Sequence, residues 1–267
     1  MREGFRSIIG IFNAKGGVGK STTAVNLTAA LARRGYKTLL IDLDPQSNAT
    51  TAFFPEIPEK TLADVLLDEL PVMQAVYKKG DNLFVLPSSF ELSIAEVQLS
   101  ANPGRDVALA SALADIAPGT FDLCVLDFPP NVGVVTTNGL GVTTDLIIPV
   151  QAHYYALQGI DIILNVIGIA RKKLNRNLKI LGALCTMYNR QTNLCQMVLE
   201  QVKEIFGERA FNTVIRTNIR LAEAPLKVSN IFDHDPKSAG AEDYNNLCQE
   251  VIERLVSLGK LSVGNDN

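Results

Sequence analysis

One stretch near the start of the chain decides its fold: Asn13-Ala14-Lys15-Gly16-Gly17-Val18-Gly19-Lys20-Ser21-Thr22. The apolar residues 8–12 precede it and are typical of a buried parallel strand. Residues 23–34 follow it, with Ala, Leu and Val at the spacing of a helix. A strand, a glycine-rich turn and a helix in this order form the context that a phosphate-binding loop requires. The stretch therefore predicts a loop that binds phosphate groups, against the alternative of a glycine-rich turn that binds nothing.

The residue types of this loop match the chemistry of a nucleotide. Because glycine lacks a Cβ atom, the backbone N–H groups of Gly16, Gly17 and Gly19 can approach phosphate oxygens closely. The N-terminus of the following helix adds a partial positive charge. Lys20 is expected to reach the β- and γ-phosphates, and the Ser21 hydroxyl is expected to bind Mg²⁺. The predicted nucleotide-binding residues are Lys15, Gly16, Gly17, Val18, Gly19, Lys20, Ser21 and Thr22.

The loop departs from the common pattern G-x-x-x-x-G-K-[ST] at one position. The first glycine of that pattern falls on Ala14, and Lys15 follows it immediately. This is the deviant form of the loop, x-K-G-G-x-G-K-[ST], which carries a second lysine at its start.

Two acidic segments follow predicted strands and complete the expected site. Residues 38–41 form an apolar run that ends in the turn Asp42-Leu43-Asp44-Pro45-Gln46, and residues 123–126 form another that ends at Asp127. Ligands of parallel α/β sheets bind beyond the carboxyl ends of the strands, so we expect these carboxylates near the loop. Asp127 is predicted to hold Mg²⁺ through water, with Asp42 as a further candidate ligand. A polar turn without a function is the alternative for the first segment.

Strands alternate with helices over nearly the whole chain, which predicts an α/β fold with a single doubly wound, mainly parallel sheet flanked by helices. The length of 267 residues fits one domain covering residues 1–267, with residues 1–6 and 259–267 expected to be flexible ends. The composition, 47% hydrophobic and 20% charged, is typical of a soluble globular protein, and no run is long enough for a membrane span. Four scattered cysteines without a C-x-x-C pair argue against an iron–sulfur or zinc site.

With these motifs the chain resembles the ParA/Soj family of partitioning ATPases, which have a P-loop NTPase fold with the deviant Walker A loop. The resemblance extends over residues 7–257. Besides the loop, it rests on Asp-x-Asp-Pro-Gln at 42–46, Asp-Phe-Pro-Pro at 127–130, Ile148-Pro149-Val150-Gln151, Tyr154-Tyr155-Ala156-Leu157-Gln158-Gly159, Arg220-Leu221-Ala222-Glu223-Ala224-Pro225 and Asp235-Pro236-Lys237-Ser238.

The resemblance implies an ATPase that uses ATP and Mg²⁺, hydrolyses slowly alone and is stimulated by a ParB-like protein. ATP would join two protomers into a sandwich homodimer, in which Lys15 reaches the other protomer's nucleotide and Asp44 positions the attacking water. Together with Lys20, these two residues are the catalytic residues that the resemblance implies. The dimer would bind double-stranded DNA without sequence preference and release it after hydrolysis. The expected function is DNA partitioning by a cytoplasmic, nucleoid-associated protein.

Residues 171–227 carry a local excess of positive charge. Eleven of them are Lys or Arg and four are Glu, a net charge of +7, whereas the whole chain has −3. Non-specific binding to DNA phosphates needs such an asymmetry, and a solvated basic surface is the alternative. Arg220 matches the family pattern directly, but Gln191 and Thr217 stand where relatives often carry arginine. The predicted DNA contacts are therefore Arg220 and the nearby Arg216 and Arg190.

A membrane-cycling positioning ATPase of the MinD type is the alternative function. It shares the loop and the sandwich dimer, but it needs a basic amphipathic helix at the C-terminus. Residues 259–267 contain one lysine and few apolar residues, which disfavours this function and predicts that the protein has no membrane partner.

Overall fold

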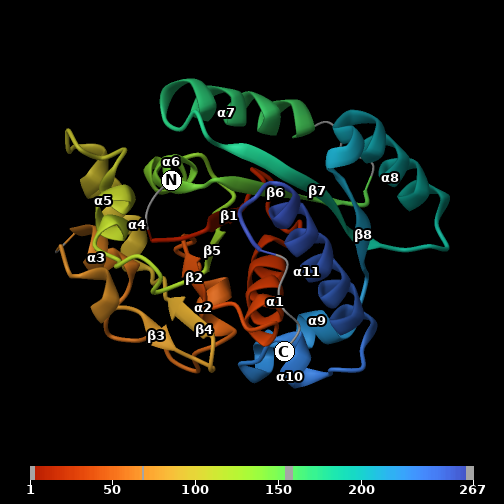
Figure 1. Ribbon diagram of the computed structural model, residues 1–267, viewed down its shortest axis with the longest axis horizontal. Coiled ribbons are helices and arrows are strands. Elements are labelled where there is room, and N and C mark those ends of the chain that lie inside the picture. Colours follow the sequence, from red (N-terminus) through yellow and green to blue (C-terminus); the bar gives the residue numbers. More distant parts are fainter. Residues whose placement is uncertain (1–3, 68, 154–158, 263–267) are drawn as a thin grey trace.

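The apolar runs of the sequence become the strands of one sheet in the computed structural model, which describes residues 4–67, 69–153 and 159–262 (Figure 1). Within these residues the strand order is β3-β4-β2-β5-β1-β6-β7-β8, and every pair is parallel except β3 with β4. All residues of β1, β2 and β5 are buried, as expected for central strands covered on both faces. The strands are β1 (Ser7–Ile11), β2 (Thr38–Asp42), β3 (Tyr77–Lys78), β4 (Leu83–Leu86), β5 (Leu123–Asp127), β6 (Asp145–Gln151), β7 (Lys179–Tyr188) and β8 (Ala210–Arg216).

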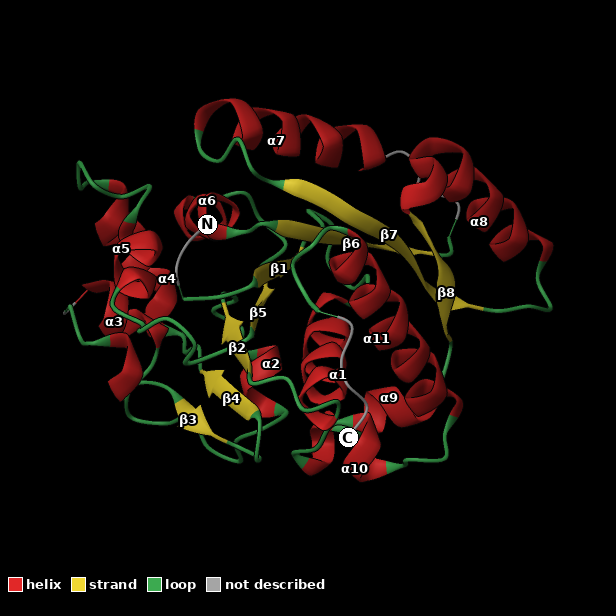
Figure 2. Ribbon diagram, in the orientation of Figure 1, coloured by secondary structure: helices red, strands yellow, loops and turns green. Residues whose placement is uncertain are grey.

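Helices cover both faces of this sheet, which confirms the predicted doubly wound α/β fold (Figure 2). One face carries α1 (Lys20–Arg33), α2 (Asn48–Thr51), α9 (Ile219–Glu223), α10 (Ile231–His234) and α11 (Ala239–Ser257). The other carries α3 (Leu62–Leu67), α4 (Glu91–Ser100), α5 (Ala108–Ala114), α6 (Val134–Val142), α7 (Ile160–Lys173) and α8 (Asn193–Phe206). None of the helices in the described chain combines the length and the apolar composition that crossing a bilayer requires.

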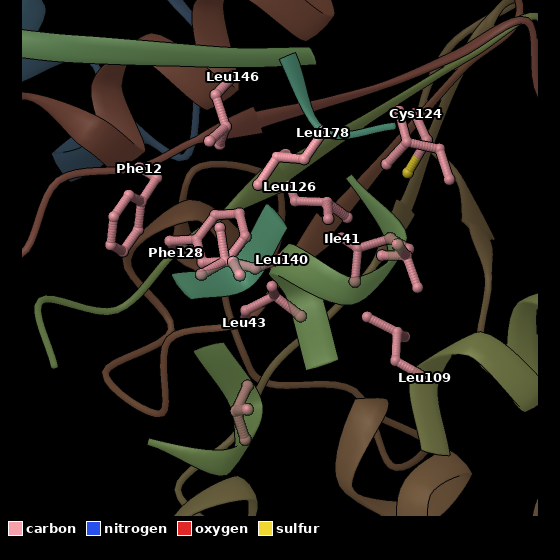
Figure 3. Packing of buried hydrophobic residues seen from close by; sticks show 14 of the residues in the cluster. Phe12, Ile41, Leu43, Leu109, Cys124, Leu126, Phe128, Leu140, Leu146 and Leu178 are labelled. Carbon is pink, nitrogen blue, oxygen red and sulfur yellow. The ribbon is translucent and has the colours of Figure 1, made fainter. Parts of the chain in front are cut away.

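Successive residues of the central strands enter opposite cores. Ile9 and Ile11 pack with α1, whereas Ile8 and Phe12 pack on the face covered by α6. Figure 3 shows this second core, where the rings of Phe12 and Phe128 meet edge to face with centroids 5.4 Å apart. Both rings lie just beyond the carboxyl ends of their strands. They therefore support the backbone segments that carry the polar residues of the expected site.

Helix α6 and strand β8 are among the elements that the hydrophobic pattern does not predict. Helix α6 includes Gly139, where an added Cβ atom would lie 2.6 Å from the ring of Phe128. Close packing therefore requires glycine at position 139. Because glycine has a low helix propensity, the sequence pattern does not predict a helix here. Strand β8 is at the edge of the sheet and exposes Asn212, so its sequence lacks the continuous apolar run of a central strand.

The described parts of both chain ends make defined contacts. Lys260 forms an ion pair with the fully buried Asp145 at the start of β6, and Leu261 is 5% exposed in the core. At the other end, Phe5 stacks on Phe121 with ring centroids 6.0 Å apart. Outside the described residues lie 1–3 and 263–267, together with residues 154–158 of the motif that begins at Tyr154.

Candidate functional site

The predicted phosphate-binding loop connects β1 to α1 at the carboxyl edge of the sheet. Gly17 and Gly19 have φ angles of 72° and 86°, in the left-handed region that residues with a Cβ atom rarely adopt. Lys15, Gly16 and Gly17 are exposed, whereas Val18 is buried. The loop is therefore open to a ligand on its outer side and anchored to the core by Val18.

Neighbouring strands fix this loop through side-chain hydrogen bonds. The Asn13 side chain accepts a hydrogen bond from the Lys15 N–H group at 2.9 Å and donates one to the Pro149 carbonyl of β6 at 2.7 Å. The Thr186 hydroxyl of β7 donates to the Val18 carbonyl at 2.9 Å. The backbone of the loop is thus held in shape by the fold itself, as a preorganised binding site requires.

Lys20, the first residue of α1, directs its ammonium group back toward the loop. Its Nζ atom donates to the Lys15 carbonyl at 2.9 Å, and the residue is only 7% exposed. Burial lowers the pKa of Lys20, whereas the nearby carboxylates of Asp127 and Asp44 raise it. A buried cation beside a glycine-rich loop is suited to bind an anion at this position.

Asp127 lies opposite Asp42 on the neighbouring strand β2, and both residues are fully buried. Neither oxygen of Asp127 accepts a hydrogen bond of ordinary geometry within the described chain. Burial is the main cause that raises the pKa of Asp127, and Asp42 raises it further, while the Ser21 hydroxyl and the Lys20 ammonium lower it. A buried carboxylate without donors, next to a serine hydroxyl, offers the hard oxygen ligands that Mg²⁺ prefers, so these residues fit that cation.

Asp42 differs from Asp127 because both of its oxygens are used inside the chain. Oδ1 accepts the Asp44 N–H group at 3.0 Å, and Oδ2 accepts the N–H and hydroxyl groups of Thr50, both at 2.8 Å. Burial raises the pKa of Asp42 to about 6, against the lowering effect of these hydrogen bonds. This geometry suits a residue that holds the following turn in place better than a ligand of a metal ion.

Asp44 is in that turn and contributes to the wall of the cavity above the loop. It is 6% exposed, and its Oδ1 atom accepts the Gln46 N–H group at 2.9 Å. Ser47, which ends the turn, has a φ angle of 56° although it is not glycine. Backbone strain of this kind persists only where the surrounding structure holds it, and it concentrates at functional sites.

A cavity of about 430 Å³ joins the loop to the acidic turn, which is a volume that suits a small-molecule ligand. The structure brings most of the predicted residues to it, but Lys15 is outside the lining on the exposed part of the loop. Val18, Asp42 and Asp127 are buried behind the wall. The predicted residues that line the cavity are Gly16, Gly17, Gly19, Lys20, Ser21, Thr22 and Asp44.

Part of the cavity wall comes from residues that the sequence argument did not assign. Met187 at the end of β7 and Leu221, Ala224 and Pro225 around α9 also line the cavity. Met187 has a φ angle of 52°, a conformation that is rare for a side chain of this size. Leu221, Ala224 and Pro225 lie within the Arg220–Pro225 motif, but nothing in the sequence indicated that this motif lies beside the phosphate-binding loop.

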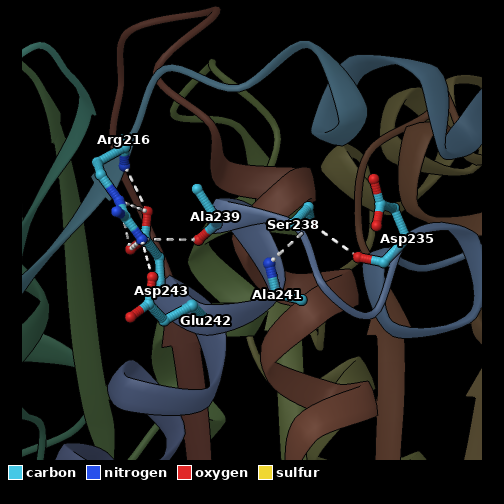
Figure 4. A network of polar contacts seen from close by, with 7 residues as sticks. All are labelled: Arg216, Asp235, Ser238, Ala239, Ala241, Glu242 and Asp243. Carbon is cyan, nitrogen blue, oxygen red and sulfur yellow. Dashed lines mark hydrogen bonds and ion pairs between the residues drawn. The ribbon is translucent and has the colours of Figure 1, made fainter.

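Arg216, one of the predicted DNA contacts, is engaged by acidic residues of the same chain (Figure 4). Its Nε atom donates to both oxygens of Asp243 at 2.8 and 3.0 Å, and its terminal nitrogen Nη2 contacts Glu242 and the Ala239 carbonyl. These partners raise the pKa of Arg216, and Asp243 is 5% exposed. The guanidinium group is therefore part of a partly exposed ion-pair network between β8 and α11, in which only Asp243 is buried.

Arg220 and Arg190 are more accessible than Arg216. The side chain of Arg220 is 50% exposed and lies 2.8 Å from Glu223 and 3.4 Å from Asp235. Hydrogen bonding to Glu223 is the main cause that raises the pKa of Arg220. Arg190 is exposed in the turn after β7. Both arginines thus remain available for the predicted contact with phosphate groups.

Comparisons with known proteins agree with these features. A family model described as an AAA domain matches residues 6–180. The chain is 42% identical over 247 residues to the sporulation initiation inhibitor protein Soj of Bacillus subtilis, covering 91% of this chain and 97% of that protein. It is 38% identical over 251 residues to the chromosome partitioning protein ParA of Caulobacter vibrioides, covering 92% of this chain and 94% of that protein.

A similar solved structure is that of cobyrinic acid a,c-diamide synthase from Mycobacterium smegmatis with a bound ATP analog and magnesium. Its TM-score is 0.78 and its sequence identity 31%, with 96% of this chain and 98% of that chain covered. The sequence identity to Soj and ParA over nearly their whole lengths decides the family. The chain belongs to the ParA/Soj family of chromosome-partitioning ATPases.

Proposed function

We propose that this protein is a DNA-partitioning ATPase that binds ATP with Mg²⁺ in the cavity at the carboxyl edge of the sheet. ATP binding joins two copies into a sandwich dimer, which binds double-stranded DNA without sequence preference. Hydrolysis is slow in the isolated protein, is stimulated by a ParB-like partner, and releases the DNA. The protein acts in the cytoplasm on the nucleoid.

The observation that carries this proposal is the arrangement of Lys20, Ser21 and Asp127 around the loop. A buried ammonium group, a hydroxyl and a buried carboxylate without donors lie together beside backbone held open by Gly17 and Gly19. Buried polar groups are normally satisfied by partners, so the unmatched oxygens of Asp127 point to a ligand. A nucleotide with a divalent cation supplies both the anion for Lys20 and the charge for Asp127.

Each residue then has a defined task in hydrolysis. Lys20 binds the β- and γ-phosphates, while Ser21 and, through water, Asp127 hold the cation. Mg²⁺, when bound there, neutralises charge that develops on the transferred phosphoryl group. Asp44 orients the attacking water from the cavity wall, because its carboxylate is fixed by the turn that follows β2. The apolar wall of Met187, Leu221, Ala224 and Pro225 suits a planar base.

Lys15 has a task outside its own cavity. It is exposed, and it does not line the cavity that its own loop forms. A cation in this position can reach a nucleotide held by a second copy that docks on the same edge of the sheet. We therefore assign it to the dimer, where it stabilises negative charge on the other copy's phosphates.

DNA binding is assigned to Arg220 and Arg190, without Arg216. The two exposed arginines belong to the segment with a net charge of +7, and phosphate contacts of this kind carry no base information. Two copies in a dimer double the number of weak contacts, so ATP binding strengthens DNA binding.

The dimer step tests the proposal directly. Asp44→Ala keeps every group that binds the phosphates and loses the one that orients water, so it is expected to accumulate as an ATP-bound dimer in gel filtration. Lys15→Ala is expected to bind ATP and remain a monomer under the same conditions. The proposal fails if Asp44→Ala elutes as a monomer at saturating ATP, or if Lys15→Ala forms the dimer as readily as the parent protein.

A further inference from the structure

Thr50 is at the junction of three segments that meet beside the cavity: the turn after β2, helix α2 and the segment after β4. It is fully buried. Its N–H and hydroxyl groups both donate to Asp42 Oδ2 at 2.8 Å, and its hydroxyl oxygen accepts the Ser88 N–H group at 2.9 Å. A hydroxyl has one proton to donate and lone pairs to accept, so the Thr50 hydroxyl uses both capacities at once.

These bonds fix the position of Asp44, although no hydrogen bond joins Thr50 to Asp44 in the described chain. Asp42 binds Thr50 with one oxygen and the Asp44 N–H group with the other. The Asp44 carbonyl in turn accepts the Ser47 N–H group at 2.8 Å, and Ser47 is held in the left-handed region. The conformation of the turn therefore depends on the orientation of the Asp42 carboxylate, which Thr50 sets from outside the turn.

We propose that Thr50 is a positioning residue for ATP hydrolysis: its hydroxyl connects Asp42 to the backbone of Ser88 and so holds the Asp44 carboxylate at the cavity wall. This role rests on the proposed function of Asp44. It concerns the rate of hydrolysis and not nucleotide affinity, because Thr50 does not line the cavity and its side chain bonds to Asp42 and Ser88, outside the phosphate-binding loop.

Thr50→Val keeps the shape of the side chain and removes the hydroxyl, which leaves the Ser88 N–H group without its acceptor. Since small displacements of a catalytic group reduce rates strongly, we expect kcat to fall about 10-fold while the Kd for ATP stays within about twofold. Thr50→Ser restores the hydroxyl and is expected to recover kcat to within about twofold of the parent value. Like Asp44→Ala, the Thr50→Val protein is expected to accumulate as an ATP-bound dimer.

Thr143→Val is the matched control. Thr143 is equally buried, but its hydroxyl donates only to the Gly139 carbonyl of its own helix, at 2.7 Å, next to the opposite edge of the sheet. The same chemical change there is expected to alter thermal stability and to leave kcat unchanged. Thr50→Ala, read in the same assays, replaces Thr50→Val if the valine variant does not fold in thermal melts.

Amide hydrogen exchange gives a readout that does not depend on turnover. The N–H groups of Asp44 and Ser88 are expected to exchange faster in Thr50→Val than in the parent or in Thr143→Val. Unchanged exchange at these two amides overturns the positioning role, as does a parental kcat in Thr50→Val or a failure of Thr50→Ser to rescue it. Absence of ATP turnover in the parent protein instead refutes the proposed function. The two failures are distinguishable, because amide exchange at Asp44 and Ser88 is measured without turnover.

Discussion

At the carboxyl edge of the sheet, Asp127 is fully buried and neither of its oxygens accepts a hydrogen bond of ordinary geometry in the described chain. On β8, by contrast, Arg216 is held by Asp243, by Glu242 and by the Ala239 carbonyl. Both residues were predicted to bind phosphate-bearing partners, directly or through a cation. A binding site retains polar groups without partners in the chain, because the ligand will supply those partners. In a structural ion pair, by contrast, the polar groups find their partners within the fold.

The largest expected effect is a loss of ATPase activity, which only the nucleotide-binding edge should show. Lys20→Ala removes the buried cation beside the loop, so we expect kcat/KM for ATP to fall about 100-fold or more. Lys37→Ala, which changes an exposed lysine just before β2, serves as the control and should match the parent protein. Equal ATPase rates for Lys20→Ala and the parent would contradict the assignment of the loop.

A second expected effect concerns stability, and it distinguishes the two arginines of the basic segment. Arg216→Ala leaves the buried carboxylate of Asp243 without its cation, so the free energy of unfolding should drop by about 2 kcal/mol. Arg220→Ala removes the exposed ion pairs with Glu223 and Asp235 and should leave the urea midpoint nearly unchanged. If urea denaturation gives the two variants the same midpoint, the proposed difference between the ion-pair network of Arg216 and the accessible Arg220 is wrong.

A third effect is expected in DNA binding. Arg220→Ala should weaken binding of the ATP-bound protein to all duplex sequences alike, because phosphate contacts do not report the base sequence. The slope of log K against log salt should become shallower by about 0.9, because the variant neutralises one phosphate fewer. Fluorescence anisotropy over a range of salt concentrations measures both quantities, with Lys37→Ala again as the control. Normal binding by Arg220→Ala would exclude this arginine from the DNA contact.

The smallest expected effect is a pH dependence at the nucleotide-binding edge. Burial raises the pKa of Asp42 to about 6, and it also raises the pKa of Asp127. At pH values between the ordinary pKa of a carboxyl group and these raised pKa values, the folded protein therefore binds more protons than the unfolded chain. For these two groups, stability without nucleotide or metal therefore increases as the pH falls from 7 toward 5. Asp127→Asn lacks one of them and should show a flatter rise in thermal melts with EDTA. Identical slopes for variant and parent would argue that Asp127 ionises normally.

The sequence predicts the nucleotide-binding edge well because each predicted residue there is tied to a strand end. Apolar runs before Asp42 and Asp127 mark the strands, and parallel strands place their carboxyl ends at one edge. The register of β2 with β5 then brings these two carboxylates opposite each other, although 85 positions separate their residue numbers. The sequence could not show that both oxygens of Asp42 accept hydrogen bonds of ordinary geometry in the described chain, from Asp44 and Thr50, while those of Asp127 do not, because that depends on side-chain orientation.

The charge of the basic segment could be counted from the sequence, but the positions of its arginine side chains in the fold could not be predicted. The net charge says nothing about whether an arginine meets a carboxylate from a distant helix, as Arg216 does with Asp243 on α11. The wall formed by Met187 and Leu221 was missed for a similar reason, since it arises where β7 and α9 come together. Helix α6 was hidden because its glycine serves packing against Phe128. Each of these features is a tertiary contact without a local signature.

The ion pair between Lys260 and Asp145 has a practical consequence for anyone who shortens this protein. Asp145 also accepts hydrogen bonds from the hydroxyls of Ser7 and Thr144, at 2.5 and 2.6 Å, so the tail, β1 and β6 converge on one buried carboxylate. Trimming the chain back past Lys260 strips the carboxylate of its cation and uncovers the pocket that Leu261 fills, so the shortened protein should be recovered in inclusion bodies.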